Sequence, residues 1–183
     1  MKASVYIATT VDGFIARPNG ELDWLPGSDG TVDPELDNED FGFNEFMNSI
    51  DVLVMGRNTY EFVISSGQWP YGNTKVIVLS STLTKLSDVV PNTVRLKSCG
   101  PIELYNELKK SDAHNLYIDG GKTIQSFLVE DLINEITITK VPVLIGEGIP
   151  LFSNIPKDIK LHHLKTVSYK NGFVQSKYKI NTK

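Results

Sequence analysis

The stretch VLVMGRNTYEFV, residues 52–63, predicts a buried strand that enters a helix through a tight turn. Residues 52–55 form a short apolar run, and Gly56 follows where the turn needs a residue without a side chain. Because a helix N-terminus presents unpaired N–H groups and the positive end of the helix dipole, such a turn favours phosphate. Three residues after the glycine add side-chain donors: Arg57, Asn58 and Thr59. The stretch equally fits a plain connection in which Arg57 pairs with a surface acid, so both interpretations stay open.

A second turn of the same kind lies in LYIDGGKTIQSFL, residues 116–128. Four residues open its helix: Gly120, Gly121, Lys122 and Thr123. Neither turn has the glycine spacing of a Rossmann fingerprint or of a P-loop, so neither of those assignments follows. Ligands of open α/β sheets bind at the carboxyl ends of the strands, where both turns fall. Together the two turns predict a dinucleotide site, whereas each alone also fits close packing of helix on sheet.

Apolar runs alternate with helical patterns along most of the chain. Strands are expected at residues 5–8, 52–55, 75–79, 93–96, 116–118 and 135–141, and helices from about residues 38–40, 57, 101 and 121. Near the C-terminus two alternating runs flank Lys170-Asn171-Gly172, and Asn-Gly between such runs is a strong hairpin signal. The pattern predicts an α/β fold whose mostly parallel, twisted sheet is flanked by helices and ends in an antiparallel hairpin.

The composition is that of an ordinary globular domain. With 40% hydrophobic and 22% charged residues, the chain is expected to form one domain over residues 1–183. The net charge of −4 gives no reason to expect nucleic acid as a partner, and no run approaches the roughly 20 apolar residues of a membrane span. Cys99 is the single cysteine, which excludes an internal disulfide and fits a reducing cytoplasm. His162 and His163 are neighbours in an expected strand and point to opposite faces, so no metal site is predicted.

A run of hydroxyl side chains favours one nicotinamide nucleotide over the other. Three such residues follow the expected strand 75–79: Ser80, Ser81 and Thr82. A site that prefers a free ribose diol usually has Asp or Glu in this place. Hydroxyl groups with Arg57 and Lys85 nearby suit a 2′-phosphate better, which favours NADP over NAD. The same hydroxyls fit a plain turn or helix cap at least as well.

Asp40 is the carboxylate that we single out for chemistry. It stands at an expected helix start, beside Phe41 and Phe43 and after the loop that holds Trp24. A half-buried acid beside aromatic rings can orient a nitrogen heterocycle or help to pass a proton to it. The helix dipole favours an aspartate in a first turn without any catalytic role, and this alternative stays open.

These stretches, taken in order, resemble the dihydrofolate reductase superfamily. Within it they resemble the reductase domain of riboflavin biosynthesis, the C-terminal domain of the bifunctional deaminase-reductase, and its small stand-alone relatives. The motifs that carry the resemblance are IATTVDGFIA (7–16), LDWL (22–25), DFGFNEF (40–46), VLVMGRNTYE (52–61), KVIVLSS (75–81), IDGGKTIQSFL (118–128) and VPVLIGEGIPLF (141–152). The last of them resembles the P-V-L-x-G-x-G segment of the riboflavin-type branch. The chain departs from the folate enzymes at Asp119, where they carry the first of three glycines.

The resemblance implies a dihydrofolate-reductase-like fold and an NADPH-dependent reductase. The implied reaction is hydride transfer to a small heterocyclic substrate, as in 5-amino-6-(5-phosphoribosylamino)uracil reductase, and the implied assembly is a homodimer. The zinc-binding deaminase domain that is commonly fused to the riboflavin enzymes has no counterpart in these 183 residues. Two alternatives stay open, which are reduction of dihydrofolate and a non-catalytic module that only binds NADP.

The resemblance also implies roles for single residues. By motif match, Asp40 falls where the folate branch keeps its substrate-orienting carboxylate. The positions that match cofactor-binding motifs are Ala8 and Ile15 at the nicotinamide, Gly56, Arg57, Asn58 and Thr59 at the phosphates, Leu79, Ser80 and Ser81 on the adenosine side, and Ile118, Gly120, Gly121, Lys122 and Thr123 at the second turn. The aromatic residues expected to frame the substrate are Trp24, Phe41, Phe43 and Trp69.

Overall fold

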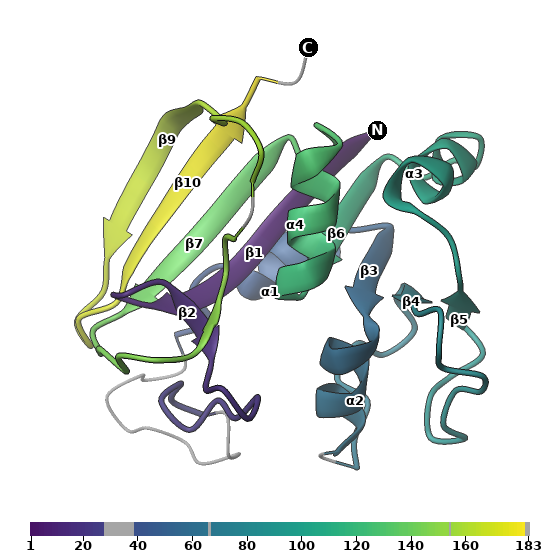
Figure 1. Ribbon diagram of the computed structural model, residues 1–183, viewed down its shortest axis with the longest axis horizontal. Coiled ribbons are helices and arrows are strands. Elements are labelled where there is room, and N and C mark those ends of the chain that lie inside the picture. Colours follow the sequence, from purple (N-terminus) through teal and green to yellow (C-terminus); the bar gives the residue numbers. More distant parts are fainter. Residues whose placement is uncertain (28–38, 66, 154, 182–183) are drawn as a thin grey trace.

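The centre of the computed structural model is a sheet that has eight strands within the described residues, which are 1–27, 39–65, 67–153 and 155–181 (Figure 1). In their order across the sheet the strands are β5 (Val94–Lys97), β4 (Lys75–Leu79), β3 (Val52–Gly56), β6 (Asn115–Asp119), β1 (Lys2–Thr10), β7 (Glu135–Val141), β10 (Val174–Ile180) and β9 (Leu161–Ser168). The strands from β5 to β7 run parallel, and β10 and β9 follow as an antiparallel pair at one edge. The predicted fold class is therefore confirmed.

Helices cover both faces of the parallel part of the sheet (Figure 1). They are α1 (Phe43–Asn48), α2 (Arg57–Ser65), α3 (Pro101–Lys109) and α4 (Gly121–Val129). Val52 and Val54 of β3 belong to the core beneath α3 and α4, whereas Leu53 and Met55 belong to the core beneath α1 and α2. Successive residues of a strand point to opposite faces, so a strand covered on both faces needs an unbroken apolar run. That is why residues 52–55 are all apolar.

The helix starts place the two turns. α2 begins at Arg57, directly after β3, and α4 begins at Gly121, directly after Gly120. α3 has Pro101 at its first position, where the missing N–H of proline costs no hydrogen bond. α1 begins at Phe43 rather than near residues 38–40, and Asn38 lies outside the described residues.

The C-terminal hairpin turns at residues 170–172, where the Asn-Gly signal predicts a hairpin. The backbone N–H of Tyr169 donates to the carbonyl oxygen of Phe173 at 2.9 Å, and Gly172 has a φ of +84°. Gly172 takes this left-handed conformation without steric cost because it has no Cβ. Two short antiparallel strands, β2 (Phe14–Ala16) and β8 (Ile149–Pro150), lie apart from the main sheet and bring the glycine-rich segment after β7 beside the first loop.

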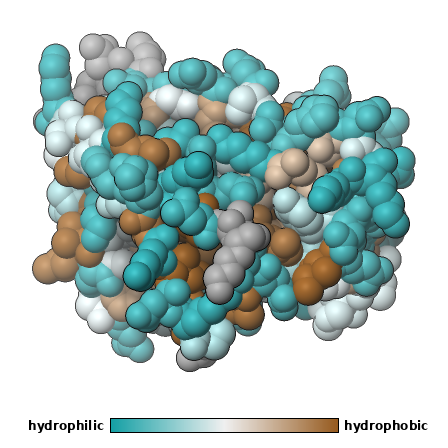
Figure 2. Space-filling model, turned by 90° about the horizontal axis from the view of Figure 1, so that it is seen from above, coloured by the Kyte–Doolittle hydropathy of each residue, from teal (hydrophilic) through white to brown (hydrophobic). Residues whose placement is uncertain are grey.

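The end of the molecule that carries both termini has a mostly hydrophilic surface with hydrophobic side chains in separate groups (Figure 2). β1 starts at this end, so the carboxyl ends of the parallel strands lie at the opposite one (Figure 1). Among the described residues, no helix is long and apolar enough to cross a membrane.

Candidate active site

A cavity of about 980 Å³ lies at the carboxyl ends of β1, β3, β4 and β6. The parallel strands bring these ends together, and α2, α4 and β2 add further walls. Clefts in this place are the usual ligand sites of open α/β sheets. The volume suits a ligand of dinucleotide size rather than a single small metabolite.

The two strand-to-helix turns fit into each other at this cavity. A Cβ atom on Gly56 would lie 2.7 Å from Oγ1 of Thr123, and a Cβ atom on Gly120 would overlap Oγ1 of Thr59. Gly120 also has a φ of +87°, a conformation that residues with side chains rarely adopt. The N-termini of α2 and α4 therefore meet at one place, and their first N–H groups and positive dipole ends act on the same space.

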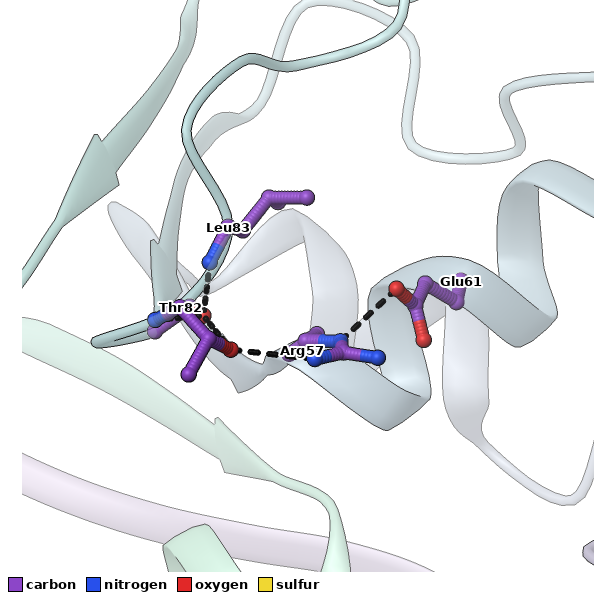
Figure 3. A network of polar contacts seen from close by, with 5 residues as sticks. Arg57, Glu61, Thr82 and Leu83 are labelled. Carbon is purple, nitrogen blue, oxygen red and sulfur yellow. Dashed lines mark hydrogen bonds and ion pairs between the residues drawn. The ribbon is translucent and has the colours of Figure 1, made fainter.

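Arg57 is held on two sides at the start of α2 (Figure 3). Its Nε donates to Oε1 of Glu61 at 2.8 Å, and its Nη1 donates to Oγ1 of Thr82 at 3.0 Å. Oγ of Ser80 accepts hydrogen bonds from the backbone N–H groups of Thr82 and Leu83, at 3.2 and 2.9 Å. Ser80 thus stabilises the turn after β4, as the second of the two interpretations of these hydroxyls predicts. The turn places Thr82 beside the guanidinium of Arg57.

Lys122 and Lys85 are placed differently from each other. Lys122 is an exposed residue of the first turn of α4 and lines the cavity, with no ion-pair partner among the described residues. Lys85 pairs with Oδ1 of Asp88 at 2.9 Å and does not line the cavity. The cations at the cavity wall are therefore Arg57 and Lys122. The predicted preference for NADP, which needs a cation for the 2′-phosphate, depends on Arg57 without Lys85.

Asp119 is a cavity residue that the sequence analysis noted only as a departure from a glycine motif. It ends β6, and its Oδ1 accepts the backbone N–H of Gly120 at 2.8 Å. Burial raises the pKa of Asp119 to about 6, against the opposing effect of that hydrogen bond. Tyr71 and Tyr117 also line the cavity, and burial together with the Asp119 carboxylate raises the pKa of both phenols. A carboxyl that titrates near neutrality inside a cleft is a candidate acid or base.

The structure gathers most of the expected cofactor-binding residues around this cavity. The cavity is lined by Ala8, Ile15, Gly56, Arg57, Asn58, Thr59, Leu79, Ser80, Ser81, Gly120, Gly121, Lys122 and Thr123, and by Trp24 among the expected substrate residues. Ile118 is the exception among the cofactor positions, because its side chain is fully buried in the core beneath α3 and α4. It alternates with Tyr117 and Asp119, which face the cavity.

Asp40 does not line the cavity. Its carboxylate accepts the backbone N–H groups of Gly42 and Asn44, at 2.9 and 3.0 Å, just before and inside α1. These two hydrogen bonds hold the pKa of Asp40 below its ordinary value. The contacts are those of a helix-start carboxylate, the alternative left open above, and the catalytic role stays a prediction.

Three expected substrate-framing aromatic residues also lie away from the cavity lining. Phe41 stacks on Phe173 with ring centroids 5.2 Å apart, beneath the C-terminal hairpin. Phe43 packs on Tyr6 and belongs to the core beneath α1. The ring of Trp69 meets that of Tyr71 edge-on at 5.3 Å, so it supports a cavity residue without lining the cavity itself.

The fold and the paired turns define the dihydrofolate-reductase-like class. The dihydrofolate reductase of Enterococcus faecalis, complexed with NADP(H), has a TM-score of 0.66 at 19% identity, over 98% of this chain and 96% of that one. The chain belongs to the RibD C-terminal domain family, whose model matches residues 2–175. The resemblance drawn from the motifs is therefore confirmed.

Relatives within and near this family cover the whole fold. A crystal structure named as that of a riboflavin biosynthesis protein from Shewanella sp. PV-4 is similar at 38% identity with a TM-score of 0.90, over 99% of both chains. The Bacillus subtilis (strain 168) protein YwjB, described as uncharacterized, is 33% identical over 162 residues, 87% of each chain. The Thermotoga maritima diaminohydroxyphosphoribosylaminopyrimidine deaminase/5-amino-6-(5-phosphoribosylamino)uracil reductase shares the fold, with a TM-score of 0.70 at 15% identity over 98% of this chain and 56% of that one.

Proposed function

We propose that the protein is an NADPH-dependent reductase that transfers hydride to a small heterocyclic substrate of the 5-amino-6-(5-phosphoribosylamino)uracil class. The observation that carries the proposal is the meeting of two helix N-termini at one large cavity, with Arg57 and Lys122 at its wall. The paired helix N-termini suit a pyrophosphate, and the guanidinium of Arg57 suits a further phosphate. Membership of the RibD C-terminal domain family supports a reductase.

The residues at the two turns fit such a nucleotide. Gly56 and Gly120 let Thr123 and Thr59 of the opposite turns pack directly against the backbone, so the N–H groups of the two helix starts lie close enough to act on one pyrophosphate. Lys122 would neutralise it, and Arg57 with Ser81 and Thr82 would hold the 2′-phosphate. The adenosine would lie by Leu79, and the nicotinamide by Ala8 and Ile15. Bound there, the nicotinamide would supply the hydride.

The substrate end of the cavity would lie among Trp24, Tyr71 and Asp119. Trp24 is 9% exposed and forms a rigid apolar wall, while Tyr71 and Asp119 offer polar groups. Reduction of a C=N or C=O group needs a proton as well as a hydride. With a pKa of about 6, Asp119 can hold that proton on its carboxyl up to about pH 6. Its hydrogen bond from Gly120 fixes the direction of the group.

The first test is a titration of the purified protein with NADPH and with NADH, followed by quenching of its two tryptophans and by thermal stability. We expect micromolar binding of NADPH and clearly weaker binding of NADH. Absence of binding by either nucleotide would contradict the proposal and leave both turns with structural roles.

A substrate screen then separates the candidate functions. Oxidation of NADPH would be followed with the phosphoribosylaminouracil and with dihydrofolate. Turnover of the first supports the proposed reaction, and turnover of dihydrofolate with tight methotrexate binding would establish folate reduction instead. NADPH binding without turnover of any heterocycle would favour the non-catalytic module.

We also propose that the protein acts as a homodimer in the cytoplasm. β9 is an edge strand whose residues are nearly all exposed, with Leu161 and Leu164 each more than two-fifths exposed. An exposed edge strand offers unpaired N–H and C=O groups to a second strand. Light scattering behind a sizing column would report twice the 20.4 kDa of one chain. Substitution of Leu164 by Lys should shift the mass toward one chain.

A further inference from the structure

We infer that Glu61 sets how strongly the site discriminates NADPH from NADH, because its charge opposes a 2′-phosphate at Arg57 while its hydrogen bond orients the guanidinium. The inference rests on the proposed function and extends it to a residue that does not line the cavity. Its basis is the two-sided contact of Arg57 in Figure 3.

The contacts fix the guanidinium in one plane. Glu61, which lies one turn further along α2, accepts the hydrogen bond from Nε. Thr82, which lies in the turn after β4, accepts one from Nη1. Among the described residues, Nη2 of Arg57 has no hydrogen-bond partner. Nη2 and the second N–H of Nη1 are therefore left to donate to a phosphate.

The same contact places a carboxylate beside the phosphate site. The side chains of Arg57 and Glu61 are 46% and 44% exposed, so water screens their attraction only in part. A 2′-phosphate carries nearly two negative charges above its second pKa of about 6. It would gain from Arg57 and be repelled by Glu61 at nearly the same place. Thr82 is neutral and adds no such repulsion.

Two variants separate the charge from the hydrogen bond. Glu61→Gln keeps an oxygen that can accept from Nε but removes the charge, whereas Glu61→Ala removes both. We expect Glu61→Gln to bind NADPH about three- to tenfold more tightly, with NADH affinity changed less than about twofold. Glu61→Ala should gain less than Glu61→Gln, because its guanidinium is no longer held. An exposed i,i+4 pair contributes little to stability, so both variants are expected to fold.

The matched control is Glu130→Gln, which makes the same charge change at the far end of α4, away from the cavity. It should leave both affinities unchanged. In an Arg57→Leu background the gain from Glu61→Gln should shrink, because the 2′-phosphate is no longer held beside residue 61. The gain should also shrink with added salt.

The outcomes distinguish the inference from the proposed function. If the wild-type chain binds neither nucleotide, the proposed function fails and the inference fails with it. If the wild type binds NADPH but Glu61→Gln leaves that affinity unchanged or weakens it, only the inference fails. A gain of the same size in the Arg57→Leu background would likewise overturn it, since the effect of Glu61 would then not depend on a phosphate held at Arg57.

Discussion

A Cβ atom on Gly56 would lie 2.7 Å from Oγ1 of Thr123, closer than Cβ atoms approach in real structures. Gly56 belongs to the turn between β3 and α2, and Thr123 to the first turn of α4. The reciprocal pair, Gly120 and Thr59, is at least as tight. The absence of two side chains therefore fixes how closely the two helix N-termini approach, and with it the width of the anion site between them.

Gly56→Ala should disturb this fit. The methyl group must push Thr123 and the start of α4 away, and overpacking of this kind costs about 1–3 kcal/mol of the free energy of unfolding. We expect a lower melting temperature and a markedly weaker affinity for NADPH and NADH alike, measured by tryptophan quenching. The control is Gly100→Ala, since Gly100 has a φ of −78° and nothing within 4 Å of an added Cβ. Equal losses in both variants would contradict the steric argument.

Lys122→Gln and Arg57→Leu should affect the two nucleotides differently. Lys122 lies at the start of α4 by the expected pyrophosphate site, a group that NADPH and NADH share. Its loss should weaken both nucleotides by a similar factor, about tenfold or less for one exposed charge. Arg57 is expected to meet the 2′-phosphate, so Arg57→Leu should weaken NADPH much more than NADH. The ratio of the two dissociation constants in each variant is the measurement, and equal ratios would place no 2′-phosphate at Arg57.

The turns could be predicted from sequence because their signal is local. A glycine directly after an apolar run, followed by polar residues and a helical pattern, specifies strand, turn and helix within a dozen residues. In a parallel sheet both turns lie at the same edge, so most of the residues that line the cavity could be predicted. Ile118 is the expected cofactor-binding residue that does not line the cavity. Side chains alternate along β6, so Ile118 points to the opposite face of the sheet from Tyr117 and Asp119.

The substrate side could not be predicted in the same way. The position of Asp40, Phe41 and Phe43 relative to the cavity depends on which face of the sheet α1 covers, and spacing along the chain does not encode this. Tyr71 and Tyr117 reach the cavity from a loop and from a buried strand, where an aromatic residue equally fits a core position. Asp119 had a readable signal, an acid at the carboxyl end of a strand directly before the two glycines of the turn.

Asp40→Ala tests whether Asp40 acts in catalysis or only at the start of α1. Loss of its hydrogen bonds to Gly42 and Asn44 should lower the free energy of unfolding by about 1 kcal/mol. Because the folded state depresses the pKa of Asp40, this stabilisation is present above its ordinary value of 3.8 and is lost as pH falls through the lower folded value. We expect turnover to persist when it is measured at a temperature at which the variant is fully folded. Loss of turnover with unchanged stability would instead favour the catalytic prediction.

Asp119→Asn should change both the stability and its dependence on pH. The folded state raises the pKa of Asp119 from 3.8 to about 6, so between these values the folded chain holds a proton that the unfolded chain has released. The free energy of unfolding of the wild type therefore falls as pH rises through this window. Above about pH 6 the whole destabilisation caused by the ionised Asp119 carboxylate is present. At about 1.4 kcal/mol per pKa unit, reduced by contact with the solvent in the cavity, Asp119→Asn should be about 1–3 kcal/mol more stable at pH 8. Below pH 4 the two melting curves should converge.

Asp119→Asn should be less active than the wild type, although it is expected to be more stable. If the protonated carboxyl of Asp119 delivers the proton that accompanies hydride transfer, wild-type kcat should decline as pH rises above about 6, the pKa of the group. Asp119→Asn should bind NADPH normally, because the amide oxygen of Asn can still accept the N–H of Gly120, but it should have a low kcat without that decline. A more stable variant with less activity is the signature of a carboxyl kept in a costly environment for its chemistry. Wild-type kcat in Asp119→Asn at pH 6 would remove Asp119 from the reaction.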